Sequence, residues 1–217
     1  MNDTHLLIDT PPELRLQLIS NGVDRIDAVL FTHDHADHTH GIDDIRAITV
    51  QRGSPIPMYG PRETLESLAS KFAYIFDDSI RVLPGTFKPE GAPVALEPGV
   101  AVRIGGADVL PLAVPHGNMR VFGYRIGNLG YVTDAKSVPD EALALLQGVR
   151  VLVLNALFWN PHPTHLSFSE AIAVARRIGA ERTFLTHLTH HDSHAALEAE
   201  LPDGISPAFD GLQVTLD

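Results

Sequence analysis

Apolar and polar positions alternate with two different periods in the first third of the chain. Short apolar runs, typical of buried strands, are separated by segments in which apolar residues recur at helical spacing. Pro residues precede the first helical segment and a Gly ends it, as is common at helix boundaries. The order of strand, helix and strand indicates an α/β fold. The predicted strands are Leu6–Ile8, Ala28–Phe31 and Pro57–Tyr59, and the predicted helices are Glu13–Ser20, Gly41–Ile48 and Pro61–Phe72.

The pattern changes further along the chain. Short β-type runs separated by Pro and Gly predict a meander at Val94–Leu96, Val100–Ile104, Val109–Val114, Val121–Ile126 and Tyr131–Thr133. Helices and strands then alternate again. The helices are expected at Pro139–Leu146, Ser167–Ile178 and Ser193–Leu201, and the strands at Val151–Leu154, Thr183–Thr186 and Leu212–Leu216. Residues 77–92, with several Pro and Gly, are expected to form an active-site loop rather than a domain boundary.

The composition is that of one globular domain spanning residues 1–217. Hydrophobic residues make up 44% of the chain, no stretch approaches the ~20 apolar residues of a membrane span, and the first residues lack the features of a signal peptide. We therefore expect a cytoplasmic protein without a membrane partner. The net charge of -11 argues against nucleic acid as a partner, because broad binding to nucleic acid needs a basic face. The absence of Cys excludes disulfides, thiolate ligands and a Cys nucleophile.

One segment, Ala28–His40, combines a buried-strand pattern with a cluster of metal-type side chains. Its apolar run is followed by four such residues within six positions: His33, His35, Asp37 and His38. Neutral imidazole and carboxylate are the ordinary ligands of zinc, manganese and iron. The spacing predicts a site that holds two divalent ions close together.

Three further metal-type residues stand where predicted strands end. His116, Asp134 and His187 each follow an apolar run directly. Side chains at the ends of neighbouring strands converge at one edge of an open sheet, which is a common location of functional sites. These three residues supply the ligand types that the first cluster lacks.

In these motifs and their order the sequence resembles the metallo-β-lactamase superfamily of binuclear hydrolases. The resemblance covers essentially the whole chain, and Ile8–Thr10 match the family's opening strand motif. It implies an α/β fold, an αββα sandwich. It also implies one metal ion on His33, His35 and His116, a second on Asp37, His38 and His187, and Asp134 as a bridge. Zinc and manganese fit this ligand set, and so does iron.

Within the superfamily the chain looks most like the phosphoribosyl 1,2-cyclic phosphate phosphodiesterases. The matching stretches are Leu154–Leu157, His162–Phe168 and Thr186–His190. The resemblance implies hydrolysis of a small phosphodiester, such as a cyclic sugar phosphate, by water activated between two cations. His165 is expected to be the general acid, and Asp37 and Asp134 to act in catalysis as well as in metal binding. His162 is expected to be a surface turn residue, and Asp9 to orient a ligand His.

The sequence departs from this group in two respects. Close relatives begin with Gly-rich strands and carry a Cys cluster that, with a His at the position of His190, holds a structural zinc. This chain has no Cys and starts a few residues before Ile8, so it is expected to lack the family's first strands, as a natural short form or a truncated one. An exposed sheet edge could then be covered by a second copy in a homodimer. His190, His191 and His194 are expected to be solvated residues near a helix start.

Four other functions remain open. Ribonuclease Z shares the ligand set but carries a substrate-clamping arm between the residues matching His116 and Asp134, which here are only 18 positions apart. A thioesterase of the glyoxalase II type is the stronger rival, although the context of His165 favours a phosphodiester. β-Lactam hydrolysis is disfavoured because His38 stands where those enzymes have another residue. The last alternative is an inactive metal-binding relic.

Overall fold

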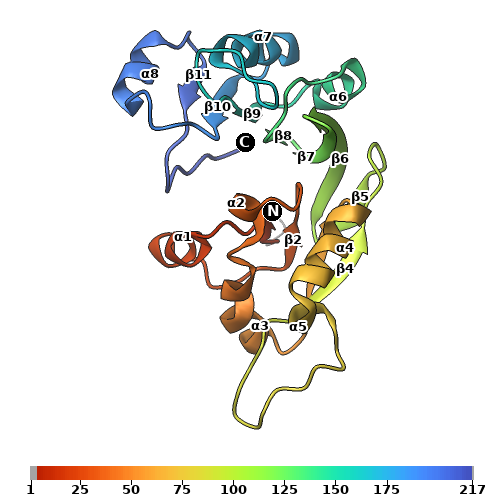
Figure 1. Cartoon of the computed structure of the whole chain (residues 1–217). Coiled ribbons are helices and arrows are strands. Elements are labelled where there is room, and N and C mark those ends of the chain that lie inside the picture. Colours follow the sequence, from red (N-terminus) through yellow and green to blue (C-terminus); the bar gives the residue numbers. More distant parts are fainter. Residues whose placement is uncertain (1–3, 217) are drawn as a thin grey trace. The chain divides into compact units, whose positions relative to one another are not determined.

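The computed structural model of the protein describes residues 4–216, which form two compact units (Figure 1). The N-terminal unit comprises residues 4–97 and 104–106, and the C-terminal unit comprises residues 98–103 and 107–216. Each unit contains its own sheet and its own cluster of buried apolar side chains. No helix among residues 4–216 is long and apolar enough to span a bilayer.

The N-terminal unit is built on a parallel sheet of four strands in the order β1-β2-β3-β4. The strands are β1 (Leu6–Ile8), β2 (Ala28–Leu30), β3 (Ile56–Gly60) and β4 (Gly91–Ala95). The helices are α1 (Leu14–Ser20), α2 (Ala36–Thr39), the 3₁₀ segment Ile42–Ile45, α3 (Arg46–Arg52), α4 (Arg62–Lys71) and α5 (Ala73–Phe76). Apolar side chains from these helices pack on β2 and β3, and this burial is the main stabilising contribution to the unit.

The C-terminal unit contains most of a mixed sheet of seven strands in the order β11-β10-β9-β8-β7-β6-β5. The strands are β5 (Val102–Ile104), β6 (Ala107–His116), β7 (Met119–Ile126), β8 (Leu129–Val132), β9 (Val151–Asn155), β10 (Arg182–Thr186) and β11 (Ile205–Pro207). The helices are α6 (Asp140–Leu146), α7 (Phe168–Ile178) and α8 (His194–Glu200). The fully buried Leu112, Leu152 and Phe168 lie in the core that joins the sheet to the helices.

The direction of the strands fixes where their ends lie. Strand β7 is antiparallel to both β6 and β8, while β8, β9 and β10 run parallel to one another. Consequently β6, β8, β9 and β10 all point the same way, and their carboxyl ends share one edge of the sheet. In the N-terminal unit β1 and β2 are parallel neighbours, so their carboxyl ends also lie together.

Most of the predicted elements are present, but the predicted closing strand Leu212–Leu216 is wrong. Residues 212–216 have no strand structure, and β11 occupies the edge beside β10 instead. Leu212, Val214 and Leu216 line an apolar pocket with Phe184 on β10. Their alternation therefore reflects the burial of one side of a coil segment, which produces the same sequence pattern as a strand.

Other predictions differ from the structure as well. The strand predicted at Val94–Leu96 as part of the meander is wrong in its place, because it overlaps β4, which pairs in parallel with β3 in the N-terminal sheet. The predicted helix Gly41–Ile48 begins as the 3₁₀ segment Ile42–Ile45 and continues as α3 to Arg52, where Gly53 ends it in a left-handed conformation. The predicted loop over residues 77–92 is shorter than expected, because β4 begins at Gly91.

Candidate metal centre

The ligand-rich segment of the N-terminal unit follows the buried strand β2. His33 lies in the loop and is buried, His35 is the N-cap residue of α2, and Asp37 and His38 lie within α2. The ring of His33 lies 4.5 Å from that of His35 and 4.3 Å from that of His38, centroid to centroid. His38 Nε2 lies 3.4 Å from Asp37 Oδ2. The structure thus brings the four predicted ligands of this unit together.

A buried carboxylate at the end of β1 orients two of these imidazoles. Asp9 Oδ2 accepts hydrogen bonds from Thr32 Oγ1 and from His38 Nδ1, both at 2.7 Å, and Asp9 Oδ1 accepts one from the Thr32 backbone N–H at 2.8 Å. Because a carboxylate can only accept, His38 carries its proton on Nδ1, and its Nε2 atom offers a lone pair that could bind a metal ion. Asp9 therefore makes the contact predicted for it.

Thr32 orients the ring of His33 in the same way, through a hydrogen bond at Nδ1. Its hydroxyl donates to Asp9, so it accepts from His33 Nδ1 at 3.0 Å, and His33 is left to bind a metal through Nε2. Burial raises the pKa of Asp9, and the hydrogen bonds from His38 and Thr32 act in the opposite direction. Sequence reasoning missed Thr32 because Thr is not itself a metal ligand.

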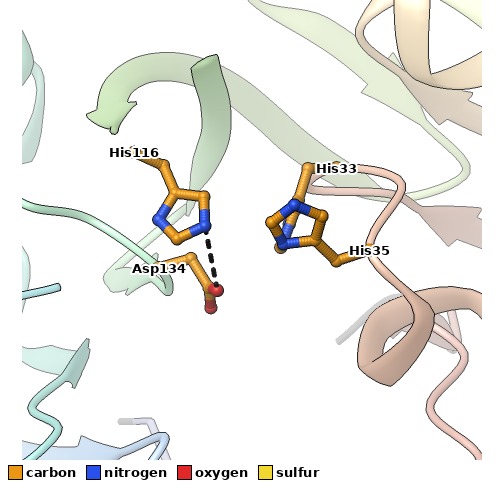
Figure 2. A group of neighbouring side chains, drawn as sticks. All are labelled: His33, His35, His116 and Asp134. Carbon is orange, nitrogen blue, oxygen red and sulfur yellow. Dashed lines mark ion pairs between the residues drawn. The ribbon is translucent and has the colours of Figure 1, made fainter. Parts of the chain in front are cut away.

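In the C-terminal unit, the predicted ligands lie at the shared edge of the sheet. His116 is the last residue of β6, Asp134 follows β8, and His187 follows β10. His187 Nε2 lies 3.3 Å from Asp134 Oδ1, and His116 Nε2 lies 3.8 Å from Asp134 Oδ2. Figure 2 shows His116 and Asp134 joined by a dashed line for their ion pair.

The distances around Asp134 match the spacing of ligands on an ion. Two atoms that each bind zinc at about 2.1 Å in tetrahedral geometry are about 3.4 Å apart. His116 donates through Nδ1 to the Thr164 carbonyl at 3.0 Å, so its Nε2 also offers a lone pair. Donor atoms of Asp134, His165 and His187 lie within 4.8 Å of one another. The residues therefore fit a divalent cation.

Backbone conformation singles out the same positions. Among residues 4–216, the non-glycine residues with positive φ are Asp9 at 59°, Asp134 at 55° and His187 at 58°. Asp9 and His187 directly follow a strand, and Asp134 follows one after a single intervening residue. All three have the left-handed backbone conformation that residues other than glycine rarely adopt. Such backbone strain is concentrated at functional sites. It gives a side chain an orientation that the regular end of a strand would not allow.

The general-acid candidate lies in the loop between β9 and α7. His165 Nε2 is 3.3 Å from Asp134 Oδ2, and the ring of His165 stacks on that of His187 at a centroid distance of 4.8 Å. His165 Nδ1 contacts Thr164 Oγ1 and His162 Nδ1, so His162 belongs to this cluster rather than to a bare surface turn. The expectation that His162 is only a surface turn residue is therefore wrong, and its position three residues before His165 was the signal in the sequence.

One further contact in the N-terminal unit went unpredicted. Asp34, between the predicted ligands His33 and His35, accepts hydrogen bonds from Ser67 Oγ at 2.6 Å and Lys71 Nζ at 2.8 Å. Burial opposes ionisation of this carboxyl, but the two hydrogen bonds outweigh it and lower the pKa of Asp34. Helix α4 thus stabilises the loop of residues 31–35, which we call the ligand loop.

His190 stands apart from the cluster. It is exposed, as are His191 and His194, and its ring lies against that of His191 at a centroid distance of 5.0 Å.

Residues 4–188 match the family described as "Beta-lactamase superfamily domain". The chain belongs to the metallo-β-lactamase superfamily.

Solved structures of related proteins agree with this assignment. A diphosphatase from the PhnP family superposes with a TM-score of 0.87 at 33% identity, over 98% of this chain and 80% of that one. This similarity places the chain in the PhnP-like group. The metallo-β-lactamase fold protein YhfI from Bacillus subtilis superposes with a TM-score of 0.77 at 21% identity, over 98% and 87% of the two chains, a likeness of fold alone. The predicted fold class is thereby confirmed.

Two curated relatives are longer proteins. An octanoyltransferase from Porphyromonas gingivalis is 34% identical over 217 residues, which are 98% of this chain and 42% of that protein. A ribonuclease Z from Kineococcus radiotolerans is 28% identical over 145 residues, which are 64% of this chain and 44% of that protein. The chain therefore spans less than half the length of these two relatives. The fold of this chain is that of the superfamily, and its grouped His and Asp side chains could hold a divalent metal ion.

Proposed function

We propose that the protein is a binuclear metal-dependent phosphodiesterase acting on a small phosphodiester, a cyclic sugar phosphate such as phosphoribosyl 1,2-cyclic phosphate. The ligands of the two ions are His33, His35, Asp37, His38, His116, Asp134 and His187. A diphosphatase among the relatives of known structure supports phosphoryl chemistry for this chain.

The observation that carries the proposal is the oriented donor set. His33, His38 and His116 each engage Nδ1 with an oxygen acceptor, so all three keep Nε2 for a cation. Such outer contacts fix the tautomer of a metal-binding imidazole and raise its basicity. Zinc and manganese both suit imidazole and carboxylate ligands.

The chain's own residues supply positioning and proton transfer. Bound ions would lower the pKa of a water molecule toward neutrality and offset negative charge that develops on the phosphoryl group. Asp134 holds its two oxygens among the Nε2 atoms of His116, His165 and His187, and its left-handed backbone fixes that position. His165 directs Nε2 toward the same place and donates a proton to the ester oxygen that leaves.

A small substrate suits the structure better than RNA. The residues between His116 and Asp134 are taken up by β7, β8 and their tight turns, which leaves no room for a clamping arm there. The net charge of -11 also disfavours a polyanion.

A second candidate is hydrolysis of an acyl thioester. A longer relative that matches 98% of this chain is named octanoyltransferase, and that name concerns the transfer of an acyl group. The same ligands would act on a thioester carbonyl, since a water activated by metal attacks either centre. His165 in that case has no alkoxide leaving group to protonate.

The test is metal-dependent hydrolysis followed by phosphorus NMR. Protein stripped of metal and reloaded with manganese or zinc is incubated with phosphoribosyl 1,2-cyclic phosphate, and a parallel reaction contains an octanoyl thioester. Ring opening that requires metal supports the phosphodiesterase. Thioester cleavage without ring opening would contradict the phosphodiesterase and support the thioesterase. Failure of the protein to bind metal would contradict both functions.

A further inference from the structure

The loop between β9 and α7 carries three polar side chains in mutual contact. His165 Nδ1 lies 2.8 Å from Thr164 Oγ1 and 3.1 Å from His162 Nδ1. His162 Nδ1 in turn lies 3.2 Å from Thr164 Oγ1 and 3.3 Å from the Thr164 backbone nitrogen. All these residues belong to the C-terminal unit and are partly buried.

The directions of these hydrogen bonds can be worked out. The Thr164 backbone N–H can only donate, so His162 Nδ1 must accept and carries no proton. Of the two facing Nδ1 atoms, the one on His165 therefore holds the hydrogen. That hydrogen points to the Thr164 hydroxyl and to His162, and it leaves His165 Nε2, 3.3 Å from Asp134 Oδ2, as the nitrogen that can exchange a proton at the site.

The surroundings of His162 favour the neutral form that this arrangement needs. Burial lowers the pKa of His162, and His165 and Lys136 act in the same direction. Phe158 packs edge-on against the His162 ring at a centroid distance of 5.7 Å, and Pro163, the next residue in the sequence, restricts the backbone of His162.

We propose that His162 is a positioning residue that, together with the Thr164 hydroxyl, accepts the Nδ1–H of His165 and so holds His165 with Nε2 toward the substrate. The proposal rests on the role of His165 as general acid given above. It has the logic of a catalytic triad, in which a third group fixes the tautomer and the orientation of a catalytic imidazole.

The proton balance of the reaction is simple. The Nε2 proton of His165 moves to the ester oxygen as the bond from phosphorus to that oxygen breaks, while a water oxygen forms the new bond to phosphorus. The proton lost by that water restores His165 Nε2. The Nδ1 proton stays on His165 throughout, held by Thr164 and His162.

Leaving-group dependence distinguishes positioning of the acid from a general structural role. We expect His162→Leu to lower kcat about 10-fold to 100-fold on a cyclic sugar phosphate, whose alkoxide needs protonation, with KM unchanged. On bis(4-nitrophenyl) phosphate, whose leaving group needs no proton, the same variant should remain within about twofold of the wild type. Equal losses on both substrates would overturn the proposal.

Two variants serve as controls. His162→Asn places an amide oxygen near the position of Nδ1, so it should accept the same hydrogen bonds and restore most of the rate. His190→Leu changes an exposed histidine outside the cluster and should have no effect.

Nitrogen-15 NMR of the imidazoles provides a readout that does not depend on activity. The wild type should show His162 unprotonated at Nδ1 and His165 protonated there, and His162→Leu should change the His165 Nδ1 signal. A proton on His162 Nδ1 contradicts the proposal even if the enzyme is active. Loss of phosphodiester cleavage by the wild type would contradict the proposed function while leaving the NMR result to decide the position of the proton.

Discussion

The two units supply metal-type side chains in opposite ways. In the N-terminal unit the ligands fall within six consecutive positions, from His33 to His38, on one loop and one short helix. In the C-terminal unit they come from strand ends as distant in sequence as His116 and His187. A local cluster is visible in sequence as a motif, whereas a dispersed one becomes a site only through the topology of the sheet.

The supports of the two clusters differ as well. The N-terminal ligands depend on side chains, because Asp9 and Thr32 fix the tautomers of His38 and His33. His116 depends instead on a backbone carbonyl, that of Thr164, which no substitution removes. Substitutions of supporting residues should therefore weaken metal binding more in the N-terminal unit, while the largest single loss should come from Asp134 itself.

Asp134→Ala should have the largest effect. It removes both carboxylate oxygens that lie among the Nε2 atoms of His116, His165 and His187. Turnover should fall by at least about 1000-fold, equivalent to about 4 kcal/mol of transition-state stabilisation, and the bound metal measured by atomic emission should fall with it. The matched control Asp108→Ala changes a carboxylate with 73% exposure and should retain both. Retention of full metal content by Asp134→Ala would contradict its role as a ligand.

Asp9→Asn should have the next largest effect. The Asn amide oxygen can accept only part of the three hydrogen bonds, and its NH₂ group would face His38 Nδ1 or Thr32 Oγ1. His38 would then be driven to the tautomer with its proton on Nε2, which blocks metal binding. Metal affinity measured by competitive titration should fall about 10-fold to 100-fold.

The control for this variant is Asp24→Asn, which carries the same change at an exposed position of the same unit. Asn is well tolerated at positive φ, so the backbone of residue 9 should not obscure the result. Unchanged affinity in Asp9→Asn would mean that the tautomer of His38 is fixed by something other than Asp9.

The contrast between the units also explains what sequence could predict. The ligand motif of residues 33–38 and the strand ends at His116, Asp134 and His187 were visible because apolar runs stop abruptly at metal-type residues. The supports were not visible, since the link from Ser67 and Lys71 to Asp34 joins positions 33 and 37 apart, and only folding brings them together. The predicted strand Leu212–Leu216 failed because one-sided burial of a coil produces the same alternation as a strand.

Ser167→Ala should affect stability without affecting the metal. Ser167 caps α7, the helix that follows the His165 loop, and forms a capping box with Glu170. The free energy of unfolding, measured by denaturant titration, should fall by about 1 kcal/mol, while metal affinity stays at the wild-type value. Ser169→Ala, an exposed change two positions further on in the same helix, is the control and should be near neutral. A parallel fall in metal affinity would show that the dispersed ligands depend on α7 more than on the sheet.

Tyr74→Phe should have the smallest effect, in the N-terminal unit. The Tyr74 hydroxyl donates to Asp43 Oδ1 at 2.9 Å, and Asp43 lies in the 3₁₀ segment directly after the ligand loop and helix α2. Burial, and then the Asp43 carboxylate, raises the pKa of Tyr74 to about 12 from an ordinary value of 10.0. Because the folded-state pKa of Tyr74 is higher than its ordinary value, the stabilisation from Tyr74 is present below pH 10 and is lost as the pH rises toward 12.

At neutral pH the Tyr74→Phe variant should lose about 0.5 kcal/mol of stability with no change in metal affinity. Its stability should fall less steeply than that of the wild type between pH 10 and pH 12. Equal slopes for the two proteins would show that the Asp43 contact does not hold Tyr74 protonated, and a loss of metal affinity would show that the local ligand cluster needs support from α5 as well as from Asp9.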